Sequence, residues 1–169
     1  PVSIYNMIYN NIDRDGNYFE TSPGYSEHTR GLYMTTAELL YNLRNDKYPE
    51  GINLYDNPQF ERFYIDAIAK NSIAGHLPQY GDAGPDTVVD KTGSAKFNSV
   101  EFNRALRFYA RSSDEDKKKE YAQRLFDMTK GDPNKLISET WAIFNVDKVE
   151  GYDTSEETSL YRPSEILGG

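Results

Sequence analysis

Residues 98–131 read NSVEFNRALRFYARSSDEDKKKEYAQRLFDMTKG, and this stretch decides the fold class. Over residues 98–111, four apolar residues recur with the spacing of one face of an α-helix: Phe102, Ala105, Leu106 and Tyr109. A second helix is expected to begin at a Ser113 cap and to run to about Lys130, with Gly131 ending it. The stretch therefore predicts two helices joined by a short turn.

The rest of the chain repeats this helical pattern. Further helices are predicted over residues 3–12, from about 23 to 45, from 58 to about 72, and from Asp132-Pro133 to about Phe144. A long irregular stretch covers roughly residues 74–97, and residues 147–169 show no helical pattern. Because strand alternation is almost absent, we predict an all-α fold of antiparallel helix hairpins in a single helical domain over residues 1–169.

Apolar spacing also predicts which side chains face inward. In the first helix these are Ile4, Met7 and Ile8. In the second they are Tyr25, Leu32, Tyr33, Leu39, Leu40 and Leu43, and in the third Phe60, Phe63, Tyr64, Ala67 and Ile68. The pair Ser22-Pro23 predicts the start of the second helix, because Ser is a favourable cap and Pro suits the first helical position.

Composition narrows the class of function. The net charge of −8 argues against non-specific binding to nucleic acid or to an anionic membrane, and the sequence holds no run apolar enough to span a bilayer. The chain lacks Cys and has two His, which excludes a disulfide, a thiolate zinc site and a Cys nucleophile. No phosphate-binding loop is present, and no metal or other cofactor is expected. Once these chemistries are excluded, the side chains that remain favour acid–base chemistry by Tyr, His, Asp and Glu.

Two polar loops at helix junctions are the candidate functional segments: DGNYFETSPGY over residues 15–25 and LPQYGD over residues 77–82. Their residue types suit β-elimination from a uronic acid, in which a proton next to a carboxylate is removed and the glycosidic oxygen leaves. Structural alternatives stay open. Asn17 is also typical of a turn, Glu20 of the approach to a helix start, and Tyr25 of a packed helix face.

The segment DGNYFETSPGY resembles the pattern D-G-x-x-x-E-x-S-P-x-Y of heparinase II/III-like polysaccharide lyases, and PQYGD resembles a second cleft loop of that family. The resemblance implies part of an incomplete α/α toroid, with residues 147–169 as a connector toward a β-sandwich domain of the same parent chain. It implies a secreted or periplasmic bacterial enzyme that cleaves an acidic polysaccharide, such as heparan sulfate or alginate, by β-elimination.

The resemblance also implies roles for individual residues. Asn17 would neutralise the uronate carboxylate, and Tyr80 would act as acid or as acid and base. His76, which follows a Gly in the irregular stretch, is a further catalytic candidate from the residues themselves. Sugar-binding or orienting roles fall to Glu20, Tyr25, Gln79 and Asp82. Because the family's base is often a His of the β-sandwich domain, the 169-residue chain alone is expected to bind sugar weakly and not to turn over. The family often has His after the motif Tyr; here Ser26 stands there, with His28 two residues on.

Two other classes of function fit the same sequence features. One is a non-catalytic glycan-binding helical module that uses the aromatic residues alone. The other is an α/α-toroid glycoside hydrolase that uses two carboxylates. Formation of an unsaturated, ultraviolet-absorbing uronate product distinguishes a lyase from both.

Overall fold

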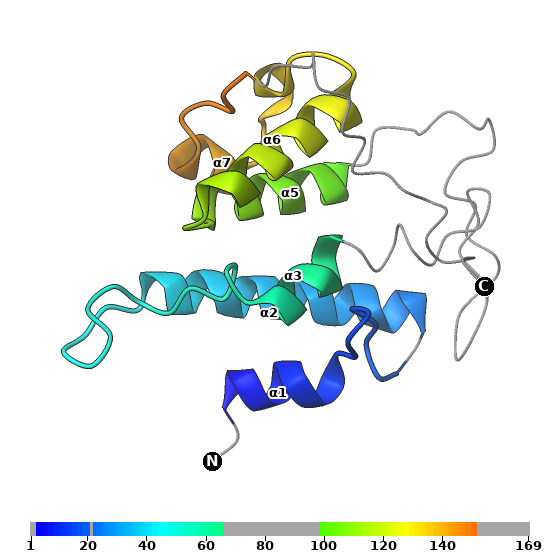
Figure 1. Cartoon of the computed structure of the whole chain (residues 1–169), viewed down its shortest axis with the longest axis vertical. Coiled ribbons are helices and arrows are strands. Elements are labelled where there is room, and N and C mark those ends of the chain that lie inside the picture. The colour runs from blue at the N-terminus through cyan, green and yellow to red at the C-terminus, as the bar shows by residue number, and fades with distance from the viewer. Residues whose placement is uncertain (1–2, 21, 66–98, 152–169) are drawn as a thin grey trace. The chain divides into compact units, whose positions relative to one another are not determined.

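The structure is a computed structural model that describes residues 3–20, 22–65 and 99–151. These residues form helices joined by turns, which confirms the all-α prediction (Figure 1). β-Pairing in the described part is limited to two isolated bridges, Ile12 with Tyr18 and Asn45 with Tyr48. Contacts divide the chain into two compact units, unit 1 over Pro1–Ala95 and unit 2 over Lys96–Gly169. Membership of a toroid stays a prediction.

Unit 1 contains α1 (Ile4–Asn11), α2 (Pro23–Asn42) and α3 (Pro58–Ile65). As predicted, Ser22 is the cap residue of α2 and Pro23 is its first residue. The helix ends at Asn42, three residues before the predicted end, because Asn45 closes a turn with Tyr48. In that turn the Asn45 Oδ1 accepts hydrogen bonds from the backbone N–H groups of Lys47 and Tyr48.

The core of unit 1 is aromatic. Its largest fully buried side chains are Tyr55, Phe60, Phe63 and Tyr64, and the rings of Phe60 and Tyr64 lie 4.8 Å apart between centroids. The hydroxyl of Tyr64 donates a 2.6 Å hydrogen bond to the carbonyl of Arg30, which holds α3 against α2. The predicted inward positions Phe60, Phe63 and Tyr64 are therefore confirmed, whereas Ala67 and Ile68 lie outside the described residues.

The predicted inward face of α2 is wrong. Four of its six members are 46–69% exposed: Tyr25, Leu32, Leu39 and Leu43. The buried face instead carries small, polar or slender side chains together with Tyr33: Ser26, Thr29, Arg30, Met34 and Ala37. Large aromatic rings from α3 already fill the space beside α2, so compact side chains allow the close approach. In α1, Ile8 is buried as predicted, but Met7 is 37% exposed.

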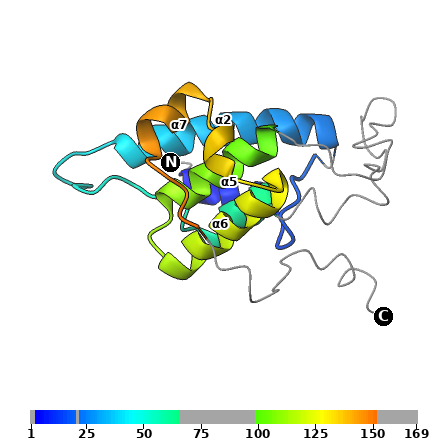
Figure 2. The same cartoon turned by 90° about the horizontal axis from the view of Figure 1, so that it is seen from above.

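Unit 2 contains α5 (Ser99–Arg111), α6 (Glu115–Thr129), the short 3-10 helix η1 (Pro133–Leu136) and α7 (Thr140–Asn145). Figure 2 shows α5 and α6 side by side as the predicted hairpin. Their shared core includes Phe102, Leu106, Ala122 and Leu125.

Two boundary predictions in unit 2 are corrected. The cap of α6 is Asp114 rather than Ser113, because the Asp114 carboxylate accepts hydrogen bonds from the N–H groups of Asp116 at 2.9 Å and Lys117 at 3.3 Å. The single helix predicted over residues 133–144 is divided into η1 and α7. The side chain of Asn134 pairs with both backbone groups of Val149, and the backbone is extended at Ile137.

Candidate functional site

The first candidate segment forms a closed loop between α1 and α2, here called the motif loop (Asp13–Glu20). The Asp13 Oδ1 accepts hydrogen bonds from the backbone N–H of Asp15 at 2.8 Å and of Asn17 at 2.9 Å. Backbone hydrogen bonds from Asp13 N to the Asn17 carbonyl and from Gly16 N to the Asp13 carbonyl complete the turn. Asp13 thus fixes the backbone conformation of the loop.

Gly16 is required in this loop for two reasons. Its φ of +87° lies in the left-handed region that side chains disfavour. In addition, a Cβ at this position would overlap the backbone carbonyl of Arg62 on α3. The loop can therefore approach α3 this closely only with glycine at position 16.

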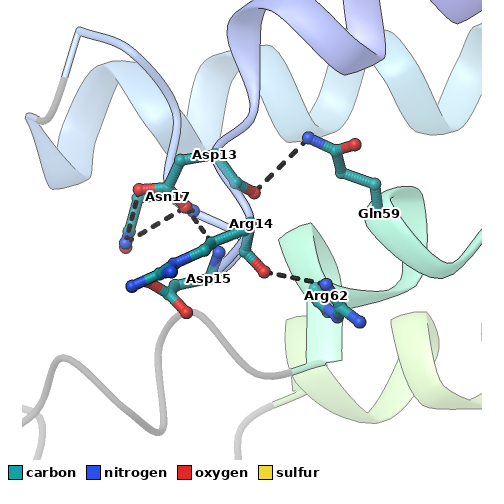
Figure 3. A network of polar contacts seen from close by, with 6 residues as sticks. All are labelled: Asp13, Arg14, Asp15, Asn17, Gln59 and Arg62. Atoms are coloured by element: carbon teal, nitrogen blue, oxygen red, sulfur yellow. Dashed lines mark hydrogen bonds and ion pairs between the residues drawn. The ribbon is translucent and has the colours of Figure 1, made fainter.

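Side chains of α3 hold the motif loop from the other side (Figure 3). The amide Nε2 of Gln59 donates to the Ile12 carbonyl, and Arg62 Nη1 donates to the Arg14 carbonyl at 2.9 Å. The ring of Tyr18 lies 6.1 Å from that of Phe63. These contacts were not predicted, because each joins residues more than forty positions apart and leaves no local pattern in the sequence.

Asn17 lies in the motif loop half-buried, with its side chain directed at Asp13. Its Nδ2 is 3.2 Å from Asp13 Oδ2, so the turn role considered for Asn17 is present in the structure. A uronate carboxylate at the same amide would lie beside the Asp13 carboxylate and meet like-charge repulsion. Neutralisation of a substrate by Asn17 stays a prediction, and it requires the amide to turn away from Asp13.

The motif side chains that follow face solvent. Phe19 is 61% exposed and Glu20 is exposed, while Tyr25 in the first turn of α2 is 50% exposed rather than packed on an apolar face. His28 is also exposed and lies one turn beyond Tyr25 on the helix surface. Phe19 was not predicted as a site residue, although it lies inside the motif. Exposed aromatic rings can stack on a sugar ring, and exposed carboxylate and imidazole groups can bind its hydroxyls.

The remaining predicted site residues, His76, Gln79, Tyr80 and Asp82, lie outside the described residues. Convergence of the two candidate loops on one cleft therefore stays a prediction. Within residues 3–20, 22–65 and 99–151, no group of three or more His, Asp or Glu side chains could hold a metal ion. None of the helices in these ranges is both long and apolar enough to cross a bilayer.

Unit 2 has its own polar cluster, built around Trp141. The Arg107 guanidinium lies 4.2 Å from the centroid of the Trp141 ring and that of Arg111 lies 5.1 Å from it. Arg107 Nη2 also bonds Glu139 Oε1 at 2.7 Å, and Arg111 Nη2 bonds Asn145 Oδ1 at 2.5 Å. Both arginines are engaged with neighbouring side chains, so this cluster joins α7 to α5 and is not a candidate substrate site.

Comparison with protein families, with curated proteins and with solved structures finds no match for this chain.

Proposed function

We propose that the chain belongs to a polysaccharide lyase that cleaves a uronic-acid polymer by β-elimination. The proposal starts from the likeness of residues 15–25 to the heparinase II/III-like motif. The observation that carries it is the fixed motif loop, which exposes Phe19 and Glu20, followed by the exposed Tyr25 in the first turn of α2. A rigid loop that presents aromatic and acidic side chains to solvent suits sugar binding better than core packing.

β-Elimination needs a base, an acid and a group that stabilises the uronate carboxylate. The base takes the proton next to the carboxylate, the C–H electron pair forms the new double bond, and the acid protonates the departing glycosidic oxygen. We assign carboxylate stabilisation to Asn17 and the acid, or acid and base, to Tyr80, with His76 as a further member of the catalytic set. Glu20, Tyr25, Gln79 and Asp82 bind or orient the sugar. The toroid and the β-sandwich domain of the parent chain belong to the same proposal.

A glycan-binding module without catalysis is the second candidate, and one observation favours it. The amide of Asn17 already donates to Asp13, whereas the rings of Phe19 and Tyr25 face solvent. Such a module would retain the aromatic contacts and need no carboxylate clamp.

In the deciding experiment, the full parent protein is incubated with heparan sulfate, alginate, hyaluronan or chondroitin. The ultraviolet absorbance of the unsaturated uronate measures turnover. We expect turnover of one polymer class, reduced by roughly two or more orders of magnitude in Tyr80→Phe. The 169-residue chain alone should bind that polymer and release no unsaturated product. Binding without product by both proteins would establish the module instead, and absence of binding and turnover would contradict both candidates.

Tyr25→Ala tests the exposed side chains of the motif separately, with Tyr48→Ala as its control. Tyr48 is also partly exposed but lies in the turn after α2, away from the motif. Tyr25→Ala should weaken polymer binding several-fold while Tyr48→Ala leaves it unchanged, because loss of one stacking ring removes about 1 kcal/mol. Equal effects of the two substitutions would remove Tyr25 from the binding surface.

A further inference from the structure

The Asp13 carboxylate in the motif loop is held by neutral donors and not by a cation. Its Oδ1 accepts the backbone N–H groups of Asp15 and Asn17, and its Oδ2 lies 3.2 Å from the side-chain Nδ2 of Asn17 (Figure 3). Among the residues that the structure describes, no ion pair includes Asp13, whereas the carboxylate of Asp15 lies 3.5 Å from the Arg14 guanidinium. A fixed negative charge therefore stands beside the Asn17 amide.

The attachment of the Asn17 side chain to Asp13 is the weaker part of this turn. Its Nδ2 lies 3.2 and 3.5 Å from the two carboxylate oxygens, whereas the backbone N–H groups lie 2.8 and 2.9 Å from Oδ1. Longer donor–acceptor distances mean weaker hydrogen bonds. Gln59 and Arg62 of α3 bind backbone carbonyls of the loop and not the carboxylate. The Asn17 amide can therefore turn away from Asp13 while the backbone of the loop stays in place.

An anionic ligand at Asn17 has to compete with this carboxylate. A ligand carboxylate needs the amide donor that already binds Asp13, and two carboxylates around one amide nitrogen repel each other. A neutral sugar hydroxyl does not meet this repulsion. The arrangement thus weakens the binding of a negatively charged ligand in particular.

We propose that Asp13 is an internal competitor that regulates the motif loop: its carboxylate occupies the Asn17 amide until a uronate carboxylate displaces it. The inference rests on the proposed function, which makes Asn17 the group that binds the uronate. Because displacement uses part of the binding free energy, a single uronate should bind weakly. A polymer contacts further residues such as Tyr25 at the same time and should bind more strongly. Asp13 thereby favours a polymer over a free uronate.

The substitution Asp13→Asn separates the charge of Asp13 from its role in the turn. An asparagine Oδ1 still accepts the two backbone N–H groups, since Asn forms the same side-chain turn as Asp. Its Nδ2 replaces the second oxygen and cannot accept a hydrogen bond from Asn17 Nδ2, because both groups are donors. The variant therefore keeps the loop, releases the Asn17 amide and removes the negative charge.

The control is Asp46→Asn, which makes the same change of charge away from the motif loop. Asp46 is exposed and follows the C-terminal end of α2, whereas the motif loop precedes the N-terminal end of this 20-residue helix. The two sites are therefore about 30 Å apart. Because the Debye length is about 10 Å at ordinary ionic strength, the charge of Asp46 is screened from Asn17.

Nuclear magnetic resonance titration of the 169-residue chain with glucuronate, and with glucose as its neutral counterpart, tests the proposal. In Asp13→Asn the dissociation constant for glucuronate should fall roughly fivefold, the factor expected when a like charge about 4 Å away in water is removed. Asp46→Asn should leave it unchanged, and neither variant should bind glucose more tightly. In the unaltered protein, the Asn17 side-chain amide signals should move when glucuronate displaces Asp13.

Three results would overturn the inference: equal dissociation constants for glucuronate in the unaltered protein and Asp13→Asn, no binding of glucuronate to either, or tighter binding of both sugars by Asp13→Asn. Asn17 amide signals that stay fixed while glucuronate binds would contradict it without any substitution. If the parent protein still cleaves a uronic-acid polymer, the proposed function stands without the internal competitor. If the parent protein also turns over no polymer, the two fail together.

Discussion

The two units of the chain use their arginines differently. In unit 1, Arg30 and Arg62 donate to backbone carbonyls, at 2.7 Å and 2.9 Å, and Arg30 also donates to the Glu27 carboxylate and lies over the Phe63 ring. In unit 2, Arg104 and Arg107 each donate to a carboxylate at 2.7 Å, and Arg107 also stacks on Trp141. The contacts with carbonyls hold the course of the main chain, whereas the contacts with carboxylates, which occur in both units, neutralise side chains inside a helical packing.

This difference indicates where to look for function. In unit 1, α3 fixes the backbone of the motif loop and leaves Phe19, Glu20 and Tyr25 directed to solvent. In unit 2 the polar side chains around Trp141 are bonded to one another. A fixed backbone with exposed side chains suits recognition, while mutually bonded side chains suit stability.

The largest expected effect is on stability, when one buried aromatic ring is removed from the core of each unit. Phe63→Ala in unit 1 and Phe108→Ala in unit 2 each remove a fully buried ring and should lower the free energy of unfolding by about 3–5 kcal/mol. Only Phe63→Ala should also loosen the motif loop, because Tyr18 packs on that ring. Urea unfolding measures the first effect, and hydrogen exchange of the Asn17 and Phe19 amides measures the second.

The single tryptophan, Trp141, lies in unit 2 and gives that unit its own fluorescence signal. Phe108→Ala should shift the fluorescence transition to lower urea. If Phe108→Ala also accelerated exchange in the motif loop as much as Phe63→Ala does, the contrast between the two units would be wrong.

Removal of one arginine from each unit should have a smaller effect. Arg30→Met deprives the buried Phe63 carbonyl of its donor and should cost about 2 kcal/mol. Arg107→Met leaves the Glu139 carboxylate without its cation, but this side chain is partly exposed whereas Arg30 is buried, so a smaller loss of about 1 kcal/mol in the free energy of unfolding is expected. Urea midpoints of the two variants give the comparison, and a larger loss in Arg107→Met would reverse it.

Two glycines of unit 1 should respond with opposite signs. In Gly16→Ala, the alanine must adopt a positive φ and displace the Arg62 carbonyl. The free energy of unfolding should therefore fall by about 1–3 kcal/mol. In Gly31→Ala, in the middle of α2, the new methyl group has open space around it. The free energy of unfolding should therefore rise by about 0.5–1 kcal/mol, because alanine has the higher helix propensity. Thermal unfolding at low protein concentration measures both. Stabilisation by Gly16→Ala would show that the loop is not held against α3.

The sequence was sufficient to predict the helices but not which face of α2 is buried. Apolar spacing located α5, while capping and end signals located α6 and the start of α2, because these signals are local in the sequence. Apolar spacing did not predict the buried face of α2, because Leu32 and Leu39 look like core residues, whereas Arg30 looks exposed. Burial of Arg30 depends on the Phe63 carbonyl, 33 positions away, and no local pattern encodes that partner.

In the candidate site, too, local features were predictable from the sequence and contacts with distant residues were not. The turn character of the motif loop was predictable from Asp15-Gly16-Asn17, since Gly and Asn favour such backbone conformations. Support from Gln59 and Arg62 was not predictable, because it requires knowledge of where α3 lies. The exposure of Tyr25 follows from the same cause, since the aromatic side chains of α3 decide which side of α2 faces inward.

The smallest expected effect is on the stability of unit 2 at acidic pH. The Asn134 side-chain amide, followed by the Asn134 backbone N–H, lowers the pKa of Asp132 below its ordinary value of 3.8. A lowered folded-state pKa means that ionised Asp132 stabilises unit 2 above the unfolded-state pKa, and that this contribution is lost as pH falls through the folded-state pKa. Asp132→Asn keeps a good cap but does not titrate, so its stability at neutral pH should stay close to that of the unaltered protein. Between roughly pH 5 and pH 2, the urea midpoint of Trp141 fluorescence should fall slightly less in Asp132→Asn than in the unaltered chain. Because Asp132 is fully exposed, the difference should shrink further in high salt, and identical midpoints at low salt would show that the Asn134 contact does not contribute to folding.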